Sequence, residues 1–137
     1  MEPRLPRFDR RGLRSAFHAT HAAFPSAPRN VSVALVGDAS MAALHLQYSN
    51  VPGTTDVLSF DLRDTGGDGR FDAEIVISVE VAKKESAKRK RTIQQELELY
   101  LIHGLLHIVG FDDHAPSDRA KMRAAERKVL SKLSNPS

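Results

Sequence analysis

Residues Thr92–His114, TIQQELELYLIHGLLHIVGFDDH, predict a buried helix that ends in a cluster of histidines. Thr92 and Gln95 have the spacing of a capping box, in which two side chains satisfy free N–H groups at a helix start. We therefore predict a helix over residues 93–109. Aliphatic side chains cover most of its circumference, which is typical of a helix buried on most sides. The positions without one form a narrow stripe: Glu96, Tyr100, His103 and His107.

Three histidines at the end of this stretch have the spacing of metal ligands. His103 and His107 are four residues apart, so both lie on one face of the predicted helix. Gly110 ends the helix, because glycine adopts a left-handed conformation easily, and the turn can bring His114 back as a third ligand. Three protein nitrogens leave a fourth position for water, as in catalytic zinc sites. A single histidine is more often a core residue, but this combination favours a metal site.

Gly104 argues against a zinc peptidase. Peptidases with the His-Glu-x-x-His motif carry their general base at this position, and glycine has no side chain that can act as one. Glycine inside a helix also lowers stability by about 1 kcal/mol relative to alanine. We therefore predict that another part of the protein approaches the helix backbone closely at this point.

Length and composition predict one domain comprising residues 1–137. The chain has 41% hydrophobic residues and no cysteine, so a sizeable core is possible, whereas disulfides and thiolate metal sites are excluded. We recognise neither a signal-peptide pattern nor an apolar run of membrane-spanning length. We expect a cytoplasmic protein without membrane partners, in keeping with the reducing compartment that the cysteine count suits.

Basic residues are concentrated in two segments, although the formal net charge is only +3. The first, Lys88-Arg89-Lys90-Arg91, directly precedes the predicted metal helix. Clustered lysines and arginines release counterions from phosphates, which indicates nucleic acid. A solvated helix face is the simpler explanation for either segment alone, but closeness to the metal helix favours phosphate binding by the first. The second segment contains Arg4, Arg7, Arg10, Arg11 and Arg14.

Strands and helices are predicted along the rest of the chain. Apolar runs predict strands over Val31–Val36, Thr55–Leu62 and Ala73–Val79. The last strand is apolar enough to be covered on both faces. Helical periodicity and capping residues predict four more helices: Asp9–Phe24, Asp38 to about Asn50, Glu80–Lys90, and one beginning at Pro116. Pro52 and Gly53 mark a turn, and Asp64–Arg70 is predicted to be an exposed hairpin connection.

Three motifs together resemble the YbeY family of metal-dependent endoribonucleases. They are Thr55-Asp56-Val57-Leu58-Ser59-Phe60, then Glu74-Ile75-Val76-Ile77-Ser78, then His103-Gly104-x-Leu106-His107-x-x-Gly110-Phe111-Asp112. The resemblance extends from about Val31 to the C-terminal helix, and residues 1–30 are least like the family.

The resemblance implies an α+β fold, with a small mixed sheet of three to four strands flanked by about five helices. It places the metal site on the buried helix and the turn that follows it. It implies one zinc ion per chain held by three histidines. It also implies a single-strand-specific endoribonuclease that matures the 3′ end of 16S rRNA and acts in ribosome quality control. The implied partners are single-stranded ribosomal RNA and the ribosomal small subunit. The clustered charge of Lys88, Arg89, Lys90 and Arg91 makes these our candidate RNA-binding residues.

Besides His45 and Glu74, which we interpret as structural, two departures from the family pattern concern the site. The family's third histidine normally follows the first by ten residues, whereas Asp113 stands there and His114 comes next. Since one extra loop residue is structurally inexpensive, we predict that His114 is the third ligand, with Asp113 as the alternative. The family commonly has an arginine after Tyr48, a residue suited to holding a phosphate, and this chain has Ser49.

Sequence alone assigns no catalytic side chain beyond the water on the metal. Glu96, Asp112 and Asp113 are candidate general bases, and each is equally able to cap a turn or orient a metal-binding imidazole. An alternative function is a noncatalytic, RNA-binding ribosome-assembly factor in which the metal only stabilises the fold.

Overall fold

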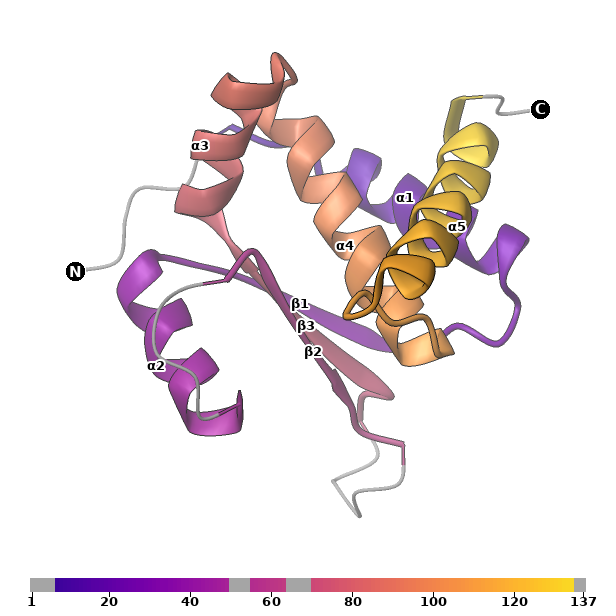
Figure 1. Cartoon of the computed structure of the whole chain (residues 1–137), viewed down its shortest axis with the longest axis horizontal. Coiled ribbons are helices and arrows are strands. Elements are labelled where there is room, and N and C mark those ends of the chain that lie inside the picture. Colours follow the sequence, from indigo (N-terminus) through magenta and orange to yellow (C-terminus); the bar gives the residue numbers. More distant parts are fainter. Residues whose placement is uncertain (1–6, 50–54, 64–69, 135–137) are drawn as a thin grey trace.

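The computed structural model describes residues 7–49, 55–63 and 70–134 (Figure 1). Their elements confirm the predicted fold class, five helices with a small mixed sheet. In chain order they are α1 (Arg10–Ala23), β1 (Val31–Val36), α2 (Asp38–Ser49), β2 (Val57–Asp61), β3 (Ala73–Ser78), α3 (Val79–Arg89), α4 (Ile93–Val109) and α5 (Pro116–Ser134). The predicted turn at Pro52 and Gly53 lies outside the described residues, and so does the predicted hairpin connection Asp64–Arg70 apart from Arg70.

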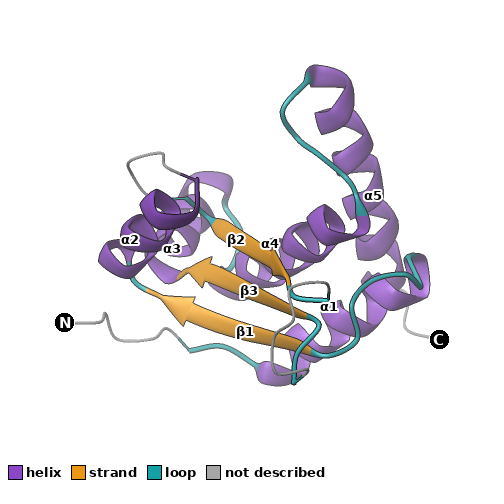
Figure 2. Cartoon of the chain, turned by 90° about the horizontal axis from the view of Figure 1, so that it is seen from below, coloured by secondary structure: helices purple, strands orange, loops and turns teal. Residues whose placement is uncertain are grey.

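The sheet has the strand order β1-β3-β2, with β1 parallel and β2 antiparallel to β3. Helices cover both faces of it: α2 lies on one side, and α4 with the remaining helices lies on the other (Figures 1 and 2). The central strand β3 is therefore buried on both faces, and Ile75, Val76 and Ile77 are at most 1% exposed. This confirms the prediction from its apolar sequence.

Helix α4 is the centre of the helical layer and has the predicted bounds. The hydroxyl of Thr92 accepts a hydrogen bond from the N–H of Gln95, and the Gln95 side chain accepts one from the N–H of Thr92. These bonds form the predicted capping box. Helices α1, α3 and α5 pack against α4, which buries its aliphatic residues: Leu97, Leu101, Ile102, Leu105 and Leu106.

Gly104 lies where α4 crosses the sheet. A Cβ atom at this position would be 2.9 Å from Oγ of Ser59 on β2 and 3.0 Å from Cγ2 of Ile75 on β3. The close approach predicted from the glycine is therefore present, and it places the two histidines beside the start of β2. No helix among the described residues is long and apolar enough to cross a membrane.

Candidate metal centre

Helix α4 presents two imidazoles from neighbouring turns at its C-terminal end. Nε2 of His103 and Nε2 of His107 are 3.1 Å apart, and both rings are partly buried. The helix ends directly after them, because Gly110 has a φ of 130° and its N–H bonds to the carbonyls of Leu106 and His107. A positive φ favours glycine, so the predicted helix end is confirmed.

The turn after Gly110 brings the carboxylate of Asp113 to these imidazoles. Its Oδ2 lies 3.3 Å from Nε2 of His103 and 3.7 Å from Nε2 of His107. Ligand atoms bound at about 2.0–2.2 Å to a tetrahedral zinc ion are roughly 3.3–3.6 Å apart, so these separations suit a single ion. Imidazole nitrogens and a carboxylate oxygen are also ordinary zinc ligands. The donor set of His103, His107 and Asp113 therefore fits a metal centre.

The structure does not bring His114 to the other two histidines. Its side chain is 87% exposed, and its Nε2 lies 3.4 Å from Oδ1 of Asp112. The guanidinium of Arg119 donates a hydrogen bond of 2.8 Å to the carbonyl of His114, which fixes the backbone of the turn. Because the side chain of Asp113 points toward His103 and His107, the side chain of the next residue, His114, points to solvent. Asp112, Asp113 and His114 form a second, more exposed group of possible metal donors, and His114 as the third zinc ligand stays a prediction.

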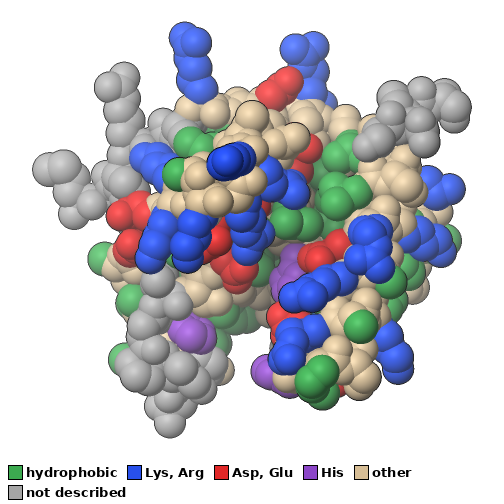
Figure 3. All heavy atoms as spheres, turned by 45° about the horizontal axis from the view of Figure 1, so that its top comes forward, with side chains coloured by type: hydrophobic (Ala, Val, Ile, Leu, Met, Phe, Trp, Pro, Cys, Tyr) green, Lys and Arg blue, Asp and Glu red, His purple; other side chains and the backbone are tan. Residues whose placement is uncertain are grey.

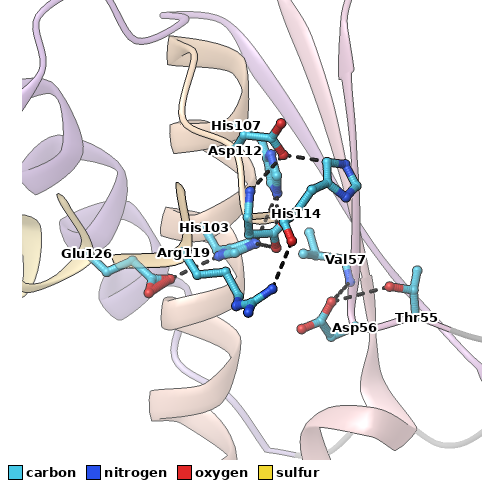
Figure 4. A network of polar contacts seen from close by, with 10 residues as sticks. Thr55, Asp56, Val57, His103, His107, Asp112, His114, Arg119 and Glu126 are labelled. Atoms are coloured by element: carbon cyan, nitrogen blue, oxygen red, sulfur yellow. Dashed lines mark hydrogen bonds and ion pairs between the residues drawn. The ribbon is translucent and has the colours of Figure 1, made fainter. Parts of the chain in front are cut away.

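Glu126 on α5 holds the ring of His103 from the other side. Its Oε2 lies 3.0 Å from Nδ1 of His103 (Figure 4). Burial lowers the pKa of His103, but the hydrogen bond and charge of Glu126, together with the charges of Asp56 and Asp113, outweigh it. The pKa of His103 is therefore raised above its ordinary value of 6.5. A carboxylate that accepts the Nδ1 proton leaves Nε2 free for a metal, as is usual for metal-binding histidines.

Asp56 faces the centre from the start of β2 (Figure 4). Its Oδ1 accepts hydrogen bonds from the N–H of Val57 at 2.8 Å and from the hydroxyl of Thr55 at 3.4 Å. These bonds fix the carboxylate, and its negative charge helps to raise the pKa of His103. Strand β2 begins directly after Asp56, at Val57, two residues later than the predicted start at Thr55.

The first half of the polar stripe of α4, Glu96 and Tyr100, is buried, whereas His103 and His107 are partly exposed. Glu96, a candidate general base, is fully buried, and its Oε1 lies 3.6 Å from Nη1 of Arg89 on α3. Both oxygens of Glu96 and the hydroxyl of Tyr100 lack a hydrogen bond within the described residues. Burial and then the negative charge of Glu96 raise the pKa of Tyr100. In this position Glu96 joins α3 to α4 rather than facing the metal donors.

The candidate RNA-binding segment lies at the opposite end of α4 from the metal donors. At a rise of 1.5 Å per residue, about 15 Å of helix separates its start from His103. Arg89 pairs with Glu85 at 3.3 Å and with Glu96, while Arg91 donates to the carbonyl of Gln95 at 3.4 Å. Lys88 and Lys90 are the exposed side chains of the segment that make no ion pair or hydrogen bond among the described residues. The sequence therefore overestimated both its closeness to the site and its free charge.

Sequence analysis did not identify Glu126 or Arg119, which both come from α5. Arg119 belongs to the polar network around the centre through its bond to the carbonyl of His114 (Figure 4). The rest of its guanidinium is exposed, with no further hydrogen bond or ion pair among the described residues. Packing of α5 on α4 brings both residues to the site, and no short motif signals it. Ser49, at the position of the family's arginine, ends α2, and its side chain lies outside the described residues.

Comparison with known proteins adds a family to this geometry. The model of the family described as endoribonuclease YbeY matches residues 10–134. The chain belongs to the YbeY family. The endoribonuclease YbeY of Anaeromyxobacter sp. (strain Fw109-5) is 36% identical over 119 residues, which cover 87% of this chain and 62% of that protein. The endoribonuclease YbeY of Mycolicibacterium vanbaalenii is 37% identical over 109 residues, which cover 73% of this chain and 59% of that protein.

The chain thus spans about three fifths of the length of these YbeY relatives. Among solved structures, the solution structure of TM1509 from Thermotoga maritima matches with a TM-score of 0.54. The match covers 92% of this chain and 85% of that one at 23% sequence identity, so it supports the fold alone.

Proposed function

We propose that this chain is a zinc-dependent endoribonuclease that cleaves single-stranded RNA. In the cytoplasm it would mature the 3′ end of 16S rRNA and act in quality control of the ribosomal small subunit. The observation that carries the proposal is the set of three converging donors at the end of α4, in a chain of the YbeY family.

His103, His107 and Asp113 would hold one zinc ion, and Glu126 would orient the ring of His103. The separations of 3.1, 3.3 and 3.7 Å between the three donor atoms support this assignment. His114 is the competing third ligand, since it follows Asp113 on an exposed turn. Bound there, zinc would act as a Lewis acid on a phosphodiester oxygen.

Arg119 would hold the substrate phosphate beside the centre. Its guanidinium donates one hydrogen bond to the carbonyl of His114, and its remaining N–H donors are exposed. A guanidinium binds phosphate through two parallel hydrogen bonds, which fixes the orientation of the phosphodiester as well as its position. This role would compensate for the serine at position 49.

Lysines and arginines would guide the rest of the RNA strand. Figure 3 shows a hollow with histidine and acidic side chains at its bottom, and Lys and Arg side chains stand on both sides, over α3 and over α5. The exposed Lys88, near the end of α3, and Lys90, which follows α3, lie near the start of α4 and would contact the RNA farther from the donors. Such a border attracts a phosphate backbone without selecting a sequence.

Asp56 is our candidate for the proton acceptor. Its carboxylate faces the centre, and the hydrogen bonds from Val57 and Thr55 use one of its two oxygens. The second oxygen is therefore able to accept a proton from the attacking hydroxyl. A positioned carboxylate of this kind typically contributes roughly 10²- to 10⁴-fold to a rate.

The test is RNA cleavage by protein stripped of metal with a chelator and then refilled with zinc. A labelled single-stranded RNA containing the 3′ region of 16S rRNA is expected to be cut only by the refilled protein. Substitution His107→Ala should abolish cleavage. Arg119→Ala should lower kcat/KM roughly 10- to 100-fold, since a hydrogen bond to a charged group contributes about 1.5–3 kcal/mol. Lys121→Ala, which removes an exposed charge from the same helix, is the matched control.

The same assay separates the nuclease from the noncatalytic assembly factor. RNA that is bound but never cut, with zinc or with any other divalent metal, would exclude the nuclease and support the assembly factor. Loss of cleavage in Arg119→Ala together with equal loss in Lys121→Ala would exclude the specific role of Arg119 and leave only a general charge effect.

A further inference from the structure

A second hollow lies on the side of α4 that faces away from the metal donors. It has a volume of about 680 Å³, and we call it the α1–β1 groove. Leu101 of α4 lines this groove. His103 follows Leu101 by two residues, which is a rotation of about 200° around the helix, so His103 points away from the groove. Strand β1 borders the groove and is one of the two edge strands of the described sheet (Figure 2). The residues that carry the argument are Phe8, Phe17, Phe71, Arg10, Arg14 and Arg29.

The groove has an apolar floor that is partly exposed to solvent. Phe71 is 40% exposed and Val33 is 39% exposed, and both line the groove. The described residues include four large hydrophobic side chains that are exposed, and two of them gather here. Exposed apolar residues that cluster in a concave surface mark a binding site more often than isolated ones do.

The rim of the groove is positively charged, and none of the described residues that line it has a carboxylate. Arg10 and Arg14 stand one helical turn apart on α1, about 6 Å along its axis, and Arg29 precedes β1. Their guanidinium groups make no ion pair with any residue in the described ranges. The nearby carboxylate of Asp72 accepts the backbone N–H groups of Arg29 and Asn30, and it does not line the groove. Two of these arginines belong to the basic segment at the start of the chain, to which the proposed nuclease site assigns no role.

We propose that the α1–β1 groove is an accessory binding site for single-stranded RNA. The inference rests on the proposed function for the source of its ligand, and it adds a second contact remote from the bond that is cut. Phosphates would pair with the arginines, while unstacked bases would lie on the phenylalanine rings, as in other proteins that bind single strands. An RNA duplex keeps its bases stacked inside and offers no base to the floor. A smaller cavity of about 300 Å³ adjoins the α1–β1 groove and shares Phe17, His18 and Arg29 with it. The two cavities together give room for more than one nucleotide.

The test is the affinity of the full chain for a labelled, unstructured 12-nucleotide RNA, measured by fluorescence anisotropy in EDTA so that no metal-dependent cleavage occurs. Arg14→Ala and Arg29→Ala should each weaken binding several-fold. Each should also reduce the slope of log affinity against log salt by about 0.7, the value for one phosphate contact of a single strand. Phe71→Ala should weaken binding roughly fivefold or more with little change of the slope, because a base stacked on an aromatic ring is lost.

Arg11→Ala is the matched control, because Arg11 lies on the same helix, is 88% exposed and pairs with Asp9 at 3.6 Å. It should change the affinity less than twofold. Circular dichroism verifies that each variant is folded, which is expected since the substituted side chains are exposed.

Unchanged affinity and salt slope in Arg14→Ala, Arg29→Ala and Phe71→Ala would overturn the inference. So would variants that keep RNA binding but lose binding of a labelled poly-glutamate peptide, because the groove would then be a site for an acidic peptide at the β1 edge. Failure of the nuclease proposal looks different: groove-dependent RNA binding would persist while no metal restores cleavage.

Discussion

Replacing Gly104 by alanine tests how closely α4 must approach the sheet. The added Cβ would lie 2.9 Å from Oγ of Ser59, and 3.0 and 3.2 Å from Cγ2 and Cδ1 of Ile75. Ser59 is able to rotate its hydroxyl away, whereas Ile75 is fully buried in the central strand. The isoleucine or the helix must therefore shift.

Two opposing effects set the magnitude of this change. Overpacking a core costs about 1–3 kcal/mol, while alanine in place of glycine favours the helix by about 1 kcal/mol. We expect the free energy of unfolding of Gly104→Ala to fall by about 1 kcal/mol, and by at most about 2 kcal/mol. Urea unfolding of the zinc-free protein, followed by circular dichroism, measures it.

Gly12→Ala is the matched control on α1. Its Cβ would meet Nε2 of Gln94 and Oε2 of Glu98, each at 2.5 Å, but these atoms are the ends of flexible side chains. Moving them offsets the gain in helix propensity, so its stability should stay within about 0.5 kcal/mol of the wild type. Comparing the two substitutions therefore distinguishes crowding against a rigid core from crowding against flexible side chains.

Combining Gly104→Ala with Ile75→Val completes a double-mutant cycle. Valine lacks Cδ1, one of the two Ile75 atoms that the new methyl group crowds, so Ile75→Val should cost less in the Gly104→Ala background than in the wild type. We expect a favourable coupling of about 0.5 kcal/mol or more. Wild-type stability of Gly104→Ala, together with an additive cycle, would refute the explanation of this glycine by close approach.

Two further predictions concern the metal centre. Asp113→Ala should lower zinc affinity by more than roughly 100-fold, which exceeds the usual effect of residues that only support a ligand. His114→Ala should change zinc affinity little. The reverse order in calorimetric titrations would show that His114 is the ligand. Glu126→Gln should lower the pKa of His103 in the zinc-free protein, as followed by NMR, and lower zinc affinity roughly 10- to 100-fold. Because the folded-state pKa of His103 is raised, its contribution to stability is present below about pH 6.5 and is lost as the pH rises through the raised pKa. The difference in unfolding free energy between wild type and Glu126→Gln should therefore shrink as the pH rises through the pKa of His103. A difference that does not depend on pH would contradict this prediction.

The bounds of α4 were predictable because both of its ends are fixed by local chemistry. Thr92 and Gln95 form the capping box at one end, and Gly110 provides the positive φ at the other. The same helical period placed His103 and His107 on one face. Each of these interactions joins residues at most four apart, so the sequence pattern contains all the information needed.

The remainder of the site depends on tertiary contacts that no local pattern records. Which side chain of the turn points inward, Asp113 or its neighbour, depends on how Arg119 holds the backbone from another helix. Glu126 reaches the centre only because α5 packs on α4. Likewise, Arg89 looked like a free cation in the sequence, but the fold pairs it with the buried Glu96.

The length of α4 has a consequence for the size of the substrate. The helix is a rigid spacer of about 15 Å between the exposed lysines before its first turn and the donors near its last. A dinucleotide seated at the donors cannot reach Lys88 or Lys90. If the chain acts on RNA as proposed, affinity should therefore rise with RNA length until the strand spans the helix, and short fragments should bind less tightly than long, unpaired RNA.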